Sequence, residues 1–175
     1  MSAGPITLAL ADTGVFRFHL DETMTYVRPG ESAPLVIPDD PKSWELSFNA
    51  ANRKTFAAGV QEWIDEREQR YAFRYMGALA ADFHRLLSNG GMFMYPAIVN
   101  HPKIEKNRPK GKLRLLYEAN VAAFIAREAG GAAIDEDGND ILDIEPQSPH
   151  QRTALYVGSR ELVESIRARL RADRR

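Results

Sequence analysis

Apolar segments of two kinds alternate along residues 44–175, and this alternation limits the chain to a small set of folds. Apolar side chains at helical spacing predict helices over residues 55–68, 75–87, 115–129 and 159–173. Short apolar runs predict strands over residues 44–48, 92–95, 132–134, 140–144 and 154–157. Strands that alternate with helices favour an α/β fold, in which helices cover both faces of a central sheet.

Glycine pairs mark the ends of two of these helices. Asn89-Gly90-Gly91 follows the second helix and Gly130-Gly131 follows the third. Gly and Asn tolerate the left-handed conformation that commonly caps a helix. The third helix is apolar almost all round, so we expect it to be buried on most sides.

The first 43 residues have a different pattern. Residues 6–10 and 15–20 predict two strands, joined by a turn at residues 12–14. A two-stranded hairpin is marginal by itself and needs a larger sheet to join. Residues 28–43 hold four prolines, which predicts a linker or an extended edge segment.

Composition excludes several classes of function. The 175 residues contain no Cys, which excludes disulfides, thiolate metal sites and a Cys nucleophile. The formal net charge of -1 argues against generic binding to nucleic acid or to acidic membranes. No apolar run approaches the roughly 20 residues of a bilayer span. The N-terminal residues lack the pattern of a signal peptide, so we expect a cytoplasmic protein.

A basic loop precedes the third helix. Residues 101–114 carry six Lys or Arg side chains against one Glu, and the segment includes Pro109 and Gly111. A loop that brings Lys and Arg to a helix N-terminus is a sensible anion site, because the terminal N–H groups and the helix dipole add to the side-chain charges. Two alternatives stay open, a solvated loop and a nucleic-acid contact.

Glu118 lies in the predicted first turn of that helix, among apolar neighbours. A carboxylate that enters a buried region must be paired or must bind a metal. Hard divalent cations such as Mg²⁺ prefer carboxylate oxygen and work beside substrate phosphates. The simpler interpretation is a Glu that favours the positive end of the helix dipole.

Further candidates lie near the ends of predicted strands. Arg74, Tyr75 and Tyr95 suit a ligand-facing loop, although ordinary aromatic packing is the alternative. Asn49 and Asn52 follow the strand at 44–48, where each could donate amide hydrogens to a ligand or cap the next helix.

Several blocks between about residues 44 and 170 resemble class I fructose-1,6-bisphosphatase, in that family's order. They include Arg74-Tyr75-Met76-Gly77, Gly90-Gly91-Met92-Phe93-Met94-Tyr95-Pro96, Lys110-Gly111-Lys112-Leu113-Arg114-Leu115-Leu116-Tyr117-Glu118-Ala119-Asn120, His150-Gln151-Arg152 and Val157-Gly158-Ser159. The resemblance implies a gluconeogenic hydrolase that removes the 1-phosphate of fructose 1,6-bisphosphate and yields fructose 6-phosphate. It also implies a homo-oligomer that uses Mg²⁺ or Mn²⁺.

The resemblance carries roles to individual positions. It implies that the 6-phosphate and sugar are contacted by Asn49, Tyr75, Tyr95 and Lys112. Asn52, which falls where relatives carry Tyr or Asn, is a further substrate-binding candidate. Arg74 matches an Arg that reaches across a subunit interface. Arg114 matches an Arg near the 1-phosphate, and Glu118 matches a metal-binding carboxylate.

What the sequence lacks is equally informative. Relatives are about twice as long, and their first half carries most metal ligands, including an Asp-Pro-Leu-Asp-Gly-Ser motif that is absent here. We therefore expect residues 44–175 to form the C-terminal domain, with a mixed sheet between helices, and residues 1–43 to belong to the N-terminal domain sheet. We also expect an extra loop at residues 98–108, weak or no phosphatase activity alone, and either a homo-oligomer or an N-terminal-half partner. The alternative is a non-catalytic sugar-phosphate-binding or interaction module.

Overall fold

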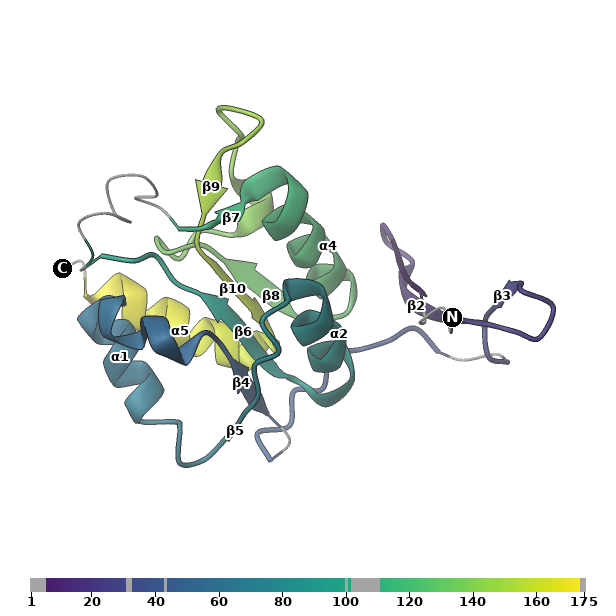
Figure 1. Cartoon of the computed structure of the whole chain (residues 1–175), viewed down its shortest axis with the longest axis horizontal. Helices are drawn as coiled ribbons and strands as arrows, with labels where there is room; N and C mark the ends of the chain where they lie inside the picture. The colour runs from purple at the N-terminus through teal and green to yellow at the C-terminus, as the bar shows by residue number, and fades with distance from the viewer. Residues whose placement is uncertain (1–5, 31–32, 43, 100, 102–110, 174–175) are drawn as a thin grey trace.

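The structure, a computed structural model, describes residues 6–30, 33–42, 44–99, 101 and 111–173. A five-stranded sheet with the order β5-β4-β6-β10-β8 forms its centre (Figure 1). In that order the strands are Ala72–Phe73, Glu45–Ser47, Gly91–Tyr95, Leu155–Gly158 and Ala132–Ile134. Strand β4 is parallel to β5 and β6, whereas β10 is antiparallel to β6 and β8. The predicted mixed α/β sheet is confirmed.

Helices cover both faces of this sheet. Helices α1 (Ala58–Asp65) and α5 (Arg160–Ala172) pack on one face, and α2 (Leu79–Asn89) and α4 (Asn120–Glu128) on the other. Strand β6 shows why, because all five of its side chains are buried and successive ones point to opposite faces. Met92 and Met94 join the α1–α5 core, while Phe93 and Tyr95 join the α2–α4 core. None of the helices in the described ranges could span a bilayer.

The predicted glycine stop after α2 is confirmed. Gly90 has a φ of 78°, and its N–H donates to the Leu86 carbonyl. A Cβ on the next residue, Gly91, would lie 2.1 Å from the Glu45 carbonyl oxygen, so only Gly lets β6 begin against β4. Ser159 Oγ accepts from the Gly91 N–H and donates to the Pro38 carbonyl, which joins this turn to the linker.

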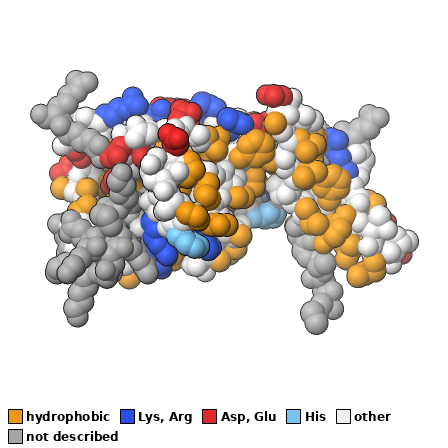
Figure 2. All heavy atoms as spheres, turned by 90° about the horizontal axis from the view of Figure 1, so that it is seen from above, with side chains coloured by type: hydrophobic (Ala, Val, Ile, Leu, Met, Phe, Trp, Pro, Cys, Tyr) orange, Lys and Arg blue, Asp and Glu red, His pale blue; other side chains and the backbone are white. Residues whose placement is uncertain are grey.

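The N-terminal residues form a separate three-stranded sheet, β1 (Ile6–Leu10), β2 (Gly14–Leu20) and β3 (Tyr26–Val27). The two strands predicted here are confirmed. Val15 is fully buried against the α2–α4 core, whereas Ile6, Leu8 and Leu10 are more than 40% exposed. These three side chains lie on one side of β1, and Figure 2 shows hydrophobic side chains gathered at the right, where the N-terminal strands lie.

The structure corrects the predicted start of α2 and one predicted strand. Residues 75–78 precede α2 because Asp82 binds the Met76 N–H and Gly77 has a φ of 82°. Residues 140–144 hold a 3₁₀ turn, η3 (Ile141–Asp143), rather than a strand. The Asp140 carboxylate accepts from the Leu142 N–H, which caps that turn.

The helix predicted over residues 115–129 is divided and less buried than expected. It begins as a π-helical turn, η2 (Leu115–Ala119), and continues as α4. Tyr117 is 54% exposed and Val121 is 53% exposed, so the expectation of burial on most sides was wrong. Ala122, Ala123 and Ala126 of α4 are buried, whereas Val121 on another side of the helix is left exposed.

Candidate functional site

A polar cleft of about 850 Å³ lies where β6, β7 (Leu113–Arg114) and the start of η2 meet. Six of the eight predicted site residues line it: Asn49, Tyr75, Tyr95, Lys112, Arg114 and Glu118. The remaining two, Asn52 and Arg74, do not. The fold thus gathers side chains from four separate parts of the sequence, which the residue pattern alone did not place together.

Lys112 presents a cation to one side of the cleft. Its Nζ lies 5.5 Å from the centre of the Tyr95 ring, a cation–π distance. Its position depends on Gly111, whose φ is 123° and whose missing Cβ would lie 2.4 Å from the Thr153 carbonyl oxygen. Gly111 therefore lets the chain pass close to β9 (Arg152–Thr153) and deliver Lys112 to the cleft.

Arg114 and Glu118 form an ion pair at the start of the π-helical turn. Arg114 Nε lies 3.2 Å from Glu118 Oε2, and the Arg114 backbone N–H donates to the same oxygen at 2.8 Å. The carboxylate of Glu118 is therefore paired with a cation, as expected for a carboxylate in a partly buried region. It also accepts a backbone N–H at the start of the helix, as expected from the simpler interpretation. The π-helical geometry is itself frequent at functional sites.

Tyr75 is held in place by a carboxylate that sequence reasoning missed. Asp82 is fully buried and accepts hydrogen bonds from Ser47 Oγ at 2.8 Å and from the Met76 N–H at 3.0 Å. Arg85 Nη1 lies 3.3 Å from the same carboxylate. The sequence did contain a signal for this role, because Asp82 is a charged residue on the apolar face of an amphipathic helix.

Burial raises the pKa of the Tyr75 phenol, with further contributions from Tyr95 and Asp82. The phenol is therefore protonated at neutral pH and can donate a hydrogen bond into the cleft.

The other predicted side chains have mixed placements. Asn49 lines the cleft and also caps the 3₁₀ helix η1 (Ala50–Thr55), since its side chain accepts from the Ala51 N–H. Asn52 lies one turn further on and donates its N–H to the Asn49 carbonyl. Arg74 is 63% exposed and lies 3.8 Å from Glu45. Most of the predicted basic loop and of the extra loop falls on residues 102–110, outside the described residues.

One cleft residue, Arg152, was not singled out as a candidate. It follows the acidic and proline-rich turn after η3 and pairs with Arg114 across the β7–β9 ladder. Its Nη1 donates to the Lys112 carbonyl. Only its place in a family-like block could have pointed to it, because a two-residue strand has no periodicity to detect.

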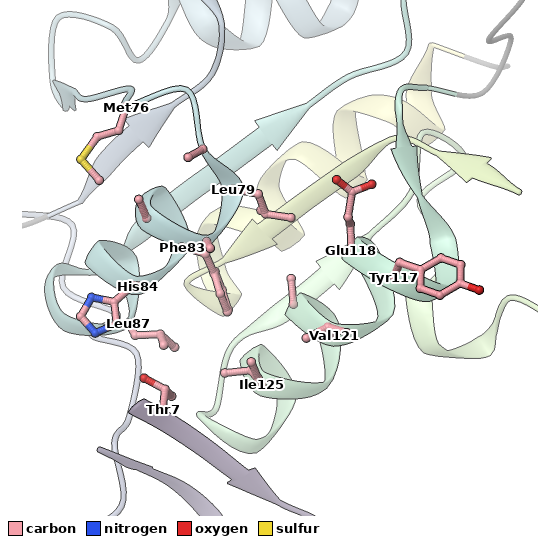
Figure 3. A pocket seen from close by; sticks show the side chains of 14 residues that line it. Thr7, Met76, Leu79, Phe83, His84, Leu87, Tyr117, Glu118, Val121 and Ile125 are labelled. Carbon is pink, nitrogen blue, oxygen red and sulfur yellow. The ribbon is translucent and has the colours of Figure 1, made fainter. Parts of the chain in front are cut away.

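A second cavity of about 850 Å³ is an apolar groove between α2 and α4 (Figure 3). Leu79 and Phe83 of α2 face Val121 and Ile125 of α4 across it, and Thr7 of β1 lies at one end. We call this surface the α2–α4 groove; its lining is Thr7, Met76, Ala78, Leu79, Ala80, Ala81, Phe83, His84, Leu87, Tyr117, Glu118, Val121, Ala122 and Ile125.

Buried polar atoms without a partner occur in and beside the groove. Thr7 Oγ1 and His84 Nε2 belong to its lining, and Arg17 Nε and Asn120 Oδ1 lie close by, all with no hydrogen-bond partner in the described part of the chain. Buried polar groups are normally satisfied, because an unmade hydrogen bond is costly.

The sequence matches one known protein family over most of its length. A family model described as fructose-1,6-bisphosphatase, C-terminal domain, matches residues 37–171. The chain belongs to the fructose-1,6-bisphosphatase family. The resemblance recognised from the sequence blocks is thereby confirmed.

Individual fructose-1,6-bisphosphatases are similar over most of the chain. The class 1 enzyme of Syntrophus aciditrophicus is 61% identical over 163 residues, which cover 93% of this chain and 48% of that protein. The class 1 enzyme of Cytophaga hutchinsonii is 45% identical over 141 residues, or 77% of this chain and 38% of the relative. The crystal structure of Leishmania major fructose-1,6-bisphosphatase in holo form matches with a TM-score of 0.74 at 35% identity, covering 90% and 46% of the two chains. The chain thus spans about half the length of these relatives.

The described residues offer few groups that could hold a metal ion. Within the described ranges, no three His, Cys, Asp or Glu side chains come together as a metal-binding group. Glu118, the carboxylate to which the family resemblance assigns a metal, is already held by Arg114. The residues present in the structure therefore do not by themselves fit a metal centre.

Proposed function

We propose that this chain supplies the sugar-phosphate-binding half of a phosphatase that converts fructose 1,6-bisphosphate to fructose 6-phosphate. The observation that carries the proposal is the cleft, where Lys112, Arg114 and Arg152 converge beside a single carboxylate, Glu118. Because that carboxylate is paired with Arg114, two cations are left to balance an anion. A phosphate dianion matches this excess of positive charge in sign and size.

The cleft also offers groups that suit a sugar. The Tyr75 and Tyr95 hydroxyls and the Asn49 amide line it beside Lys112. We assign the 6-phosphate and sugar to this group and the 1-phosphate to the Arg114 side. The assignment uses neutral hydrogen-bonding groups for the sugar hydroxyls and cations for the phosphates.

We propose that Mg²⁺ serves the reaction, with most of its ligands from a second polypeptide segment; Glu118 would join them by exchanging its ion pair with Arg114 for the metal. When bound, such ions neutralise charge on the phosphoryl group and activate water. This chain's own share is to bind and orient the sugar phosphate. Alone, we expect it to release phosphate weakly or not at all.

The partner we propose for the α2–α4 groove is the half of the protein that relatives have and this chain does not match. The groove is apolar and partly exposed, and unsatisfied polar atoms lie along it. Relatives carry about as many further residues as this chain has, which is enough to cover it. We further propose a cytoplasmic homo-oligomer in which the exposed Arg74 reaches a neighbouring subunit.

Calorimetric titration with fructose 6-phosphate tests the binding role. We expect saturable binding by the wild-type chain and none by Lys112→Ala. A phosphate-release assay with Mg²⁺ then tests catalysis, with and without the separately expressed N-terminal half of the Syntrophus aciditrophicus relative. Strong release by this chain alone, abolished by Glu118→Gln, would contradict the proposed division of labour.

A second candidate is a sugar-phosphate-binding module without turnover. The engagement of Glu118 by Arg114 favours it, together with the absence of a three-ligand metal group in the described residues. It predicts the same binding of fructose 6-phosphate, but no phosphate release even when the N-terminal half is added.

A further inference from the structure

Arg152 occupies a position in the cleft that the proposed function does not explain by itself. It lies on β9 directly opposite Arg114 of β7, so two guanidinium groups enter the cleft from neighbouring strands. Like charges at directly opposite positions of a ladder destabilise a sheet. The repulsion between Arg114 and Arg152 therefore calls for a group of opposite charge near Arg152.

The partner that the structure provides for Arg152 is a neutral one. Its Nη1 donates to the Lys112 carbonyl, and none of the carboxylates in the described ranges forms an ion pair with it. Most other half-buried arginines in the described ranges behave differently, although Arg17 also has only a neutral partner, the Ser88 hydroxyl. Arg53, Arg67 and Arg85 each pair with an Asp or Glu. A half-buried charge without a counter-ion is the condition that a bound anion relieves.

We propose that Arg152 is a phosphate ligand of the cleft, an inference that rests on the proposed sugar-phosphate function. The planar guanidinium has five N–H donors, and one of them is used on the Lys112 carbonyl. The remaining donors can grip two oxygens of one phosphate, a geometry that Lys cannot reproduce. The bond to Lys112 also fixes the main chain that carries the neighbouring cation.

Binding measurements on the full chain test this role. Fructose 6-phosphate and inorganic phosphate are titrated into wild type, Arg152→Gln, Arg152→Lys and Arg160→Gln. Arg160 is the matched control, because its guanidinium also donates to a main-chain carbonyl, that of Gly130, but outside the cleft. Since charge-assisted hydrogen bonds are the strong ones, we expect Arg152→Gln to weaken both ligands about tenfold or more. We expect partial recovery in Arg152→Lys and no change in Arg160→Gln.

The outcomes separate this inference from the proposed function. If Lys112→Ala abolishes binding but Arg152→Gln binds as tightly as wild type, Arg152 is not a ligand and the proposed function stands. If wild type binds neither ligand, both proposals fail. If Arg152→Gln and Arg152→Lys lose thermal stability in step with affinity, the role of Arg152 is structural and the inference is overturned.

Discussion

Asp82 shows how much a single buried carboxylate can organise. It is fully buried and binds the Ser47 hydroxyl, the Met76 N–H and the Arg85 guanidinium. These partners belong to a strand, a loop and the same helix, so one side chain fixes the loop that carries Tyr75. Its contribution to the cleft is indirect, through the position of that phenol.

We therefore expect Asp82→Asn to lower the free energy of unfolding by about 2–3 kcal/mol, because the fully buried carboxylate loses its ion pair with Arg85 and its charged hydrogen bonds to Ser47 and Met76 become weaker. Affinity for fructose 6-phosphate should fall as well, since the Tyr75 loop loses an anchor. Urea unfolding and calorimetric titration measure the two effects. Asp143→Asn, at an exposed position, is the matched control and should change neither. Unchanged unfolding of Asp82→Asn would show that the network is unimportant.

His84 gives the stability of the chain a pH dependence. Burial lowers the pKa of this imidazole below its usual value of 6.5, and the nearby Arg17 lowers it further. The unfolded chain then binds the proton more readily than the folded chain, so stability is greatest above about pH 6.5 and falls as the pH drops below it. Urea unfolding at a series of pH values should show this slope, and His84→Gln should flatten it. An equal slope in that variant would assign the effect to other groups.

At the scale of elements, the sheet and its helices were predictable because their periodicity is strong. Strand β6 and helix α5 match their predicted ranges to within a residue or so. The errors at α2 and η3 arose where a carboxylate accepts a hydrogen bond from a backbone N–H and so changes the local structure. Asp82 does this before α2, and Asp140 does this at η3. Such hydrogen bonds between side chain and backbone depend on tertiary neighbours, and a local sequence pattern does not show those neighbours.

The two-residue strands β7 and β9 were also not predictable from a local pattern, because they are too short to show periodicity. These strands position Lys112, Arg114 and Arg152 in the cleft. We expect Gly111→Ala to destabilise the chain by about 1–3 kcal/mol, because its Cβ would collide with the backbone of Thr153 and Ala154. The displaced β7 should also weaken fructose 6-phosphate binding. Gly30→Ala is the matched control, with a positive φ but no atom within 4 Å of its Cβ. Equal losses in the two variants would mean that backbone conformation, not the collision, dominates.

At the scale of the whole molecule, six predicted residues share a cleft, yet Arg152 was overlooked and Asn52 lies outside the lining. The residue pattern indicated an anion site at the basic loop, and the family resemblance supplied the sugar-phosphate roles of the other residues, but the pattern did not show which loops converge. The degree of burial of α4 was also unpredictable. The sequence of an apolar helix does not show whether its own chain or another polypeptide covers it. In this chain Val121 of α4 is left 53% exposed.

The exposed side of α4 leads to a test of the proposed partner half. We expect Val121→Asp to weaken binding of the N-terminal half of the Syntrophus aciditrophicus relative at least tenfold, because a charge would enter an apolar contact. Its own free energy of unfolding should change by no more than about 0.5 kcal/mol, as for other surface substitutions. Val36→Asp, at a residue that is 68% exposed but outside the groove, is the control and should bind normally. Equal weakening by both variants would exclude the groove as the docking surface.

The cleft and the α2–α4 groove share a wall. Ala78, Leu79 and Glu118 line both cavities. An occupant of the groove therefore touches the side chains that border the sugar-phosphate site, and a bound sugar phosphate touches the border of the groove. If the groove occupant changes the affinity for the sugar phosphate by some factor, the sugar phosphate changes the affinity for the groove occupant by the same factor, because linkage between binding free energies is reciprocal. Because three residues belong to both linings, the two sites are placed for allosteric coupling, with either occupant acting as the effector of the other.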